Sequence, residues 1–81
     1  MATQDRPALR PREVEVLKWF HAGYGPADIA TLLHLSLHTV RDHFREIRRK
    51  YGVSKSAFAL TLAEQDGLFA QEAPDGDGPA T

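Results

Sequence analysis

Apolar residues recur at helical spacing through residues 37–51, the segment LHTVRDHFREIRRKY. One side of this segment carries an apolar stripe at steps of three and four, the pattern of a helix packed by one face: Leu37, Val40, Phe44, Ile47 and Tyr51. The other side is polar and mostly cationic over about four turns. A helix of this kind suits the DNA major groove, although most charged helix faces are simply solvated.

Capping and breaking residues divide the rest of the chain into three further helices. Ser36 is placed to cap the basic helix, and Gly52 is placed to end it. Pro11 and Pro26 each suit a first helical position, where the missing N–H costs nothing. The chain is therefore predicted to be all-α, with four helices at about 11–22, 26–33, 37–51 and 55–66.

Only three residues, His34, Leu35 and Ser36, join the second predicted helix to the third. Two helices, a tight turn and a capped basic second helix describe a helix-turn-helix. We expect the ordered domain to cover residues 9–69, after a disordered N-terminus at 1–8. Residues 70–81 are acidic and rich in Pro and Gly, so we expect a disordered acidic tail there.

Charge is distributed unevenly, although the formal net charge is only −1. Residues 41–55 carry six basic and two acidic side chains, whereas residues 64–81 carry five acidic and no basic ones. DNA affinity depends on a local patch of positive charge more than on the net charge of the chain, so this uneven distribution is compatible with a nucleic-acid partner. The absence of cysteine excludes disulfides and thiolate metal sites, and we expect a cytoplasmic location.

Residues 9–68 contain a set of motif residues whose order and spacing can be compared with those of known domains. They are Leu9-x-Pro11-Arg12-Glu13-x-x-Val16-Leu17, Gly23, Ile29-Ala30-x-x-Leu33, Leu35-Ser36-x-x-Thr39-Val40-Arg41-x-His43, Ile47-x-x-Lys50-x-Gly52-Val53, Ala59, Ala63 and Gly67-Leu68. In this pattern the chain resembles the LuxR/GerE-type DNA-binding domain, which is also found at the C-terminus of NarL/FixJ response regulators. The resemblance implies a four-helix domain whose third helix reads the major groove and whose fourth often forms the dimer contact.

The resemblance and the side-chain chemistry together suggest DNA contacts on the third helix. Arg41 and Arg45 match base-contacting positions of the family, and arginine on guanine is the commonest specific contact. Asp42 either accepts from a cytosine amino group or pairs with Arg45 or Lys18, and His38 is a further candidate for base contact. His43 also suits packing against the second helix. The expected phosphate contacts are Thr39, His43, Arg48, Arg49, Lys50 and Lys55.

Three departures from the family pattern bear on stability and affinity. Arg10 stands where members usually have a threonine helix cap, and a lost cap commonly costs about 1 kcal/mol. His34 replaces the usual glycine of the turn, although His tolerates positive φ better than most residues. Glu46 puts an acid on the third helix, where members usually have a neutral or basic residue.

The fourth predicted helix has two distinguishable sides. Ala59, Leu60 and Ala63 match inward positions of the family. The expected dimer contact is then formed by Phe58, Thr61, Leu62 and Gln65. In the alternative interpretation, Phe58 folds back over the first helix.

We therefore expect a sequence-specific transcriptional regulator that binds double-stranded DNA as a homodimer, with RNA polymerase as a further candidate partner. One alternative is a helix-turn-helix that binds RNA polymerase or another regulator instead of DNA, which Glu46 and the acidic tail favour. Another is a promoter-recognition domain like that of sigma factors, which shares the helix-turn-helix but lacks the pattern around Gly52 and Gly67.

The sequence offers little for catalysis or ligand binding. No nucleophile–base pair or carboxylate pair is spaced in the sequence as catalysis would require, so we expect that the chain is not an enzyme. The four histidines lack a carboxylate or thiolate that would complete a site, so we expect no metal. The longest apolar run is far too short to cross a bilayer, and we expect no cofactor, small-molecule ligand or membrane partner for this chain.

Overall fold

The computed structural model describes residues 8–69 and contains four helices and no strand in that range. They are α1 (Pro11–His21), α2 (Pro26–Leu33), α3 (Leu37–Tyr51) and α4 (Ser56–Gln65). The predicted all-α fold is confirmed, and every helix end lies within one residue of its expected position. The expectations for residues 1–7 and 70–81 lie outside the described residues.

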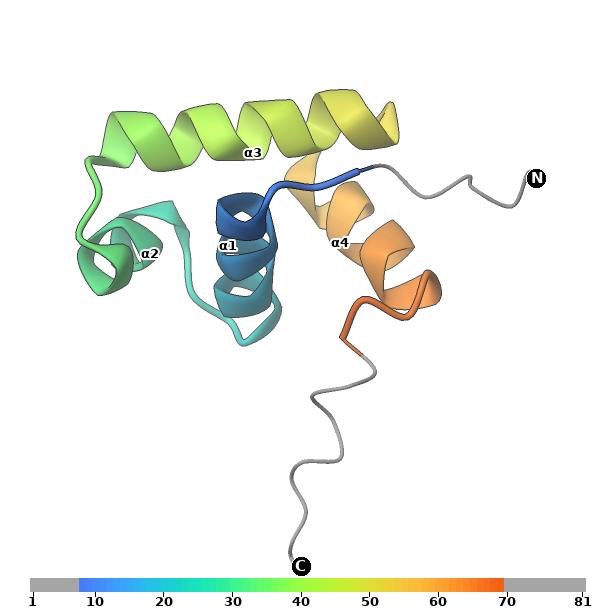
Figure 1. Cartoon of the computed structure of the whole chain (residues 1–81), viewed down its shortest axis with the longest axis horizontal. Coiled ribbons are helices and arrows are strands. Elements are labelled where there is room, and N and C mark those ends of the chain that lie inside the picture. The colour runs from blue at the N-terminus through green and yellow to red at the C-terminus, as the bar shows by residue number, and fades with distance from the viewer. Residues whose placement is uncertain (1–7, 70–81) are drawn as a thin grey trace, which may run out of the picture.

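Helix α3 lies along one edge of the molecule, with α1, α2 and α4 all on the same side of it (Figure 1). It packs against each of these three helices. The outward side of α3 therefore forms one whole edge of the domain, unobstructed by any other described helix (Figure 1).

The core draws side chains from every helix, and the apolar stripe predicted for α3 supplies its centre. Val40 and Ile47 are fully buried and Phe44 is nearly so, whereas Leu37 at the start of the stripe remains 37% exposed. The other buried apolar residues are Val16, Leu17, Ile29, Ala30, Ala59, Ala63 and Phe69. Full burial of Ala59 and Ala63 brings the α4 backbone close to its neighbours, because a methyl side chain needs little space.

The turn between α2 and α3 forms as the capping pattern predicts. Ser36 accepts a hydrogen bond from the backbone N–H of Thr39 at 3.0 Å, which supplies one of the four amides that a helix start leaves unpaired. His34 ends α2 with φ 58° and ψ 42°, in the left-handed region. The N–H of Leu35 then donates to the carbonyl of Ala30 at 2.9 Å, so the turn closes with histidine in the place of glycine.

Beyond α4 the chain folds back onto the end of α1. Phe69 is 6% exposed, and its ring stacks on His21 with 4.1 Å between centroids and 8° between planes. Nε2 of His21 lies 2.9 Å from a carboxylate oxygen of Glu64 on α4. His21 thus connects α1 both to α4 and to the residues that follow it, a role that its sequence position did not indicate.

Candidate nucleic-acid interface

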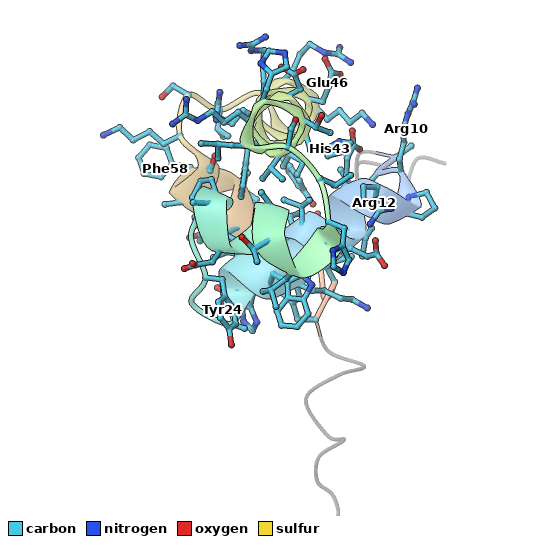
Figure 2. The ribbon with its side chains drawn as sticks, turned by 90° about the vertical axis from the view of Figure 1, so that its left-hand side faces the viewer. Arg10, Arg12, Tyr24, His43, Glu46 and Phe58 are labelled. Atoms are coloured by element: carbon cyan, nitrogen blue, oxygen red, sulfur yellow. The ribbon has the colours of Figure 1, made fainter. Side chains whose placement is uncertain are left out.

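The outer side of α3 consists of the residues left free by the core contacts, and they are polar: His38, Arg41, Asp42, Arg45, Glu46 and Arg49. The side chains of His38, Arg45 and Arg49 are 84%, 71% and 67% exposed. Figure 2 looks along α3 and shows its side chains projecting away from the other helices. A rigid helix therefore presents a row of polar side chains to solvent, three of which are arginines.

Asp42 lies between His38 and Arg45. One carboxylate oxygen is 3.3 Å from Nε2 of His38, and the other is 3.5 Å from Nη1 of Arg45. Of the interpretations left open for Asp42, the structure shows the ion pair with Arg45. These pairs are exposed and long, and pairs of this kind contribute about 0.3–0.5 kcal/mol on a helix. They are weak enough for a ligand to replace.

Glu46 forms a closer pair with Arg49. A single carboxylate oxygen of Glu46 accepts from Nε of Arg49 at 3.0 Å and from Nη2 at 2.7 Å. This hydrogen bonding holds the pKa of the Glu46 carboxyl below its ordinary value and raises the pKa of Arg49. Glu46 therefore stays ionised and neutralises Arg49, which the sequence predicts as a phosphate contact.

Lys50 has a different role from the one predicted. Its ammonium lies 2.7 Å from Oε1 of Glu13, a carboxylate that is 2% exposed at the start of α1, and 3.1 Å from the carbonyl oxygen of Ala8. The same oxygen of Glu13 accepts from the backbone N–H of Arg10 at 2.9 Å. Arg10 offers no acceptor of its own, so only this half of a capping box forms. Lys50 holds α3 to α1 and does not join the outer cations.

Three arginines of α3 line one open groove beside the helix, together with residues from each of the other helices: Arg41, Arg45, Arg48, Phe44, Phe20, Pro26 and Ser56. Nη1 of Arg48 donates to the hydroxyl of Ser56 at 3.0 Å, which fixes that guanidinium over the start of α4. The groove thus continues the cationic outer side of α3 toward α4.

The other expected DNA contacts flank the outer side. Thr39 is half-buried and accepts from the Ser36 hydroxyl at 2.9 Å. His43 is half-buried and lies on one side of α3, whereas Phe58 of α4 lies on the other (Figure 2). Lys55 is exposed just before α4, with its ammonium 6.0 Å from the ring centroid of Phe58.

Two classes of site are absent from residues 8–69. No group of three or more His, Cys, Asp or Glu side chains in that range is arranged to hold a metal ion. No helix in it is long and apolar enough to cross a membrane.

Comparisons with known proteins agree with this architecture. The family model described as bacterial regulatory proteins, luxR family, matches residues 7–63. The transcriptional activator protein BjaR1 of Bradyrhizobium diazoefficiens is 34% identical over 55 residues, which are 68% of this chain and 23% of that protein. The transcriptional activator protein VanR of Vibrio anguillarum is 34% identical over 64 residues, 79% of this chain and 27% of that protein.

Among solved structures, the response regulator ChrA of a heme-sensing two-component system matches with a TM-score of 0.72 and 34% identity, covering 83% of this chain and 33% of that one. This chain spans about a quarter of the length of the two curated activators. The matched family consists of regulatory proteins and is not an enzyme family. Because the family model covers most of the four helices, the chain belongs to the luxR family of bacterial regulatory proteins and is a helix-turn-helix DNA-binding domain of a transcription regulator.

Proposed function

We propose that α3 enters the major groove of double-stranded DNA and that Arg41 and Arg45 contact base edges there. The observation that carries this proposal is the exposure of both arginines on the one helix side that no other described helix covers. Arg41 makes no ion pair within residues 8–69, and Arg45 makes only the 3.5 Å pair with Asp42. Both guanidinium groups are therefore available for the paired acceptors of guanine.

The positions next to these arginines extend the contact. His38 and Asp42 lie on the same side of α3, one turn apart, and both are within reach of base edges. Thr39 and His43 on one flank, and Arg48 and Lys55 on the other, are the proposed phosphate contacts. Arg49 becomes a phosphate contact on release from Glu46, whereas Glu13 holds the ammonium of Lys50 within the domain.

Duplex binding at fixed salt tests the proposal, using selection from a randomised library followed by titration of the selected site. The logarithm of the binding constant is expected to fall with log salt at a slope of about −0.9 per phosphate contacted. Replacing Lys55 with glutamine is expected to weaken every sequence alike and to flatten this slope by about 0.9.

Arg12 provides the matched control, because its exposed side chain pairs with Glu15 on α1 and points away from α3 (Figure 2). The substitution Arg12→Gln should leave the slope unchanged. Absence of duplex binding even at low salt would reject the proposal and favour the alternative of a helix-turn-helix that binds another protein.

Replacing Glu46 with glutamine is expected to tighten DNA binding by up to about fivefold, because breaking an exposed ion pair on a helix has only a small effect. The change removes an acid from the outer side of α3 and releases Arg49 for a phosphate. Affinity for two unrelated duplexes, measured by fluorescence anisotropy, should rise by the same factor. An unchanged affinity would place Glu46 and Arg49 away from the duplex.

We also propose that the domain dimerises on DNA through α4. Phe58 is 53% exposed, so it does not fold back into the core between α4 and α1. Thr61 and Gln65 are exposed and Leu62 is half-buried beside them. On a domain this small, an exposed aromatic ring beside a leucine forms an apolar surface that favours contact with a second copy of the domain.

The double substitution Phe58→Glu and Leu62→Glu is expected to abolish cooperative binding to a two-half-site duplex, because two carboxylates would be buried at the contact. Binding to a single half-site should survive within about twofold, since surface changes outside the DNA contact alter stability and binding little. Electrophoretic mobility shifts on single and double half-sites measure both quantities. Cooperative binding by the double variant would exclude α4 as the dimer contact.

RNA polymerase remains a candidate partner that co-purification with the DNA-bound domain can test. We place the domain in the bacterial cytoplasm, where its DNA lies.

A further inference from the structure

The groove beside α3 has a cationic rim and an apolar floor. Its rim carries Arg41, Arg45 and Arg48, and no carboxylate of residues 8–69 lines it. The phenyl rings of Phe20 and Phe44 form the floor, 5.1 Å apart between centroids. Among residues 8–69, Arg48 is bound only by a neutral hydroxyl and Arg45 only by Asp42 at 3.5 Å, so little negative charge balances the arginines of this groove. An anionic segment with small side chains would match it.

The chain carries such a segment in residues 70–81, AQEAPDGDGPAT. Its only charged side chains are Glu72, Asp75 and Asp77, and it has no bulky residue. A carboxylate and a guanidinium form paired, charge-assisted hydrogen bonds, which are among the stronger polar contacts in proteins. Three carboxylates in a run of six residues therefore complement three arginines spread over two turns of α3.

The point where the described chain ends starts this segment beside the end of α1, which contributes one residue to the groove. Phe69 stacks on His21, and the next residue back along α1 is Phe20, which lines the groove. Eight residues beyond Phe69, which end at Asp77, can extend up to about 28 Å, and we expect Asp75 and Asp77 to reach the rim. A tether this short also gives an effective concentration on the order of millimolar.

We propose that residues 70–81 dock in this groove, with Glu72, Asp75 and Asp77 against Arg41, Arg45 and Arg48. The docked segment occupies two arginines that the proposed function assigns to bases, so it competes with DNA. The competition rests on that proposed function, whereas the docking does not. Apparent DNA affinity is reduced by the fraction of molecules in which the groove is occupied.

A spin label placed after the acidic residues tests docking in the full chain without DNA. The chain has no cysteine, so Gly78→Cys provides a single attachment site. At low salt, paramagnetic broadening of amide signals is expected to centre on Arg41, Arg45 and Arg48, and to vanish when Glu72, Asp75 and Asp77 become Gln, Asn and Asn. Uniform broadening, or broadening centred on Arg10, Arg12 or Arg49, which are exposed outside this groove, would overturn the proposal.

A mixed sample shows whether the segment in the groove belongs to the same chain or to a second copy. Spin-labelled chain without isotope is mixed with ¹⁵N-labelled chain that has no spin label. No broadening of the groove signals is expected in this sample. Broadening there would mean that the segment of a second copy fills the groove, and would overturn docking within one chain.

Duplex titration separates docking from competition. The neutralised variant is expected to bind DNA about two- to tenfold more tightly than the parent chain. A control variant, Glu15→Gln with Asp28→Asn and Asp66→Asn, removes the same number of charges from other described surfaces and should gain less. Equal gains would reject competition. Docking without any DNA binding would instead reject the proposed function alone, and DNA binding without docking would reject this inference alone.

Discussion

Replacing Glu13 with alanine is expected to destabilise the domain by about 3 kcal/mol, the lower end of the range for breaking a buried ion pair. The Glu13 carboxylate accepts from both Lys50 and the backbone N–H of Arg10, and its removal leaves two donors without that acceptor. The Lys50 side chain is only 18% exposed, so water cannot fully replace the lost contact. Urea unfolding followed by far-ultraviolet circular dichroism measures the change.

Companion variants separate the charge from the hydrogen bond. Glu13→Gln keeps an acceptor for Arg10 and should lose less stability than Glu13→Ala. Glu13→Leu combined with Lys50→Met should recover much of the loss, because neither partner is left unpaired and similar volumes are retained. A loss below about 0.5 kcal/mol in Glu13→Ala, the usual size of a surface effect, would contradict a stabilising role for the pair.

This ion pair connects stability to the proposed DNA contact. Lys50 lies in the last turn of α3, and Glu13 lies in the first turn of α1. The pair therefore holds the C-terminal half of α3 against α1, while the Ser36 cap and Val40 hold its start. A helix held at both ends presents its outer side in one orientation, which base contacts require.

Local chemistry explains why the helices were predictable from sequence. The apolar stripe of α3, the Ser36 cap and the glycine after Tyr51 each act within one or two turns, so their effects are visible in a short window. His34 adopts the left-handed conformation that its position in the turn requires. The outer side of α3 was predictable for the same reason, because it is what the core leaves free.

The pairing of charged residues was not predictable in the same way. Lys50 follows Arg48 and Arg49 in the sequence and looks like a continuation of the basic run. It is also three positions after Ile47, at the margin of the apolar stripe, and that was the available signal for its burial. Its partner Glu13 is 37 residues away, so the pair depends on how α1 crosses α3. Burial of Phe69 against His21 likewise depends on tertiary packing.

Arg41→Ala is expected to cost the preferred DNA site about 1–3 kcal/mol, the discrimination of one bidentate arginine–guanine contact, and to leave non-specific binding nearly intact. Arg41 makes no ion pair within residues 8–69, so its loss leaves no described partner unsatisfied. Its exposed position also limits any effect on folding. The affinity change on the preferred site can therefore be attributed to the DNA contact.

Arg45→Ala should weaken the base preference at a different position of the DNA site. The two arginines are four residues apart and rise about 6 Å along α3, so they reach adjacent or next-adjacent base pairs. Selection from a randomised duplex library should show that Arg41→Ala loses the base preference at one position of each half-site. Arg45→Ala should lose it at another position. Lys55→Gln serves as the control, because loss of a phosphate contact weakens all sequences alike. If either arginine variant behaves like Lys55→Gln, that arginine contacts phosphate, and base contacts must come from His38, Thr39 or Asp42.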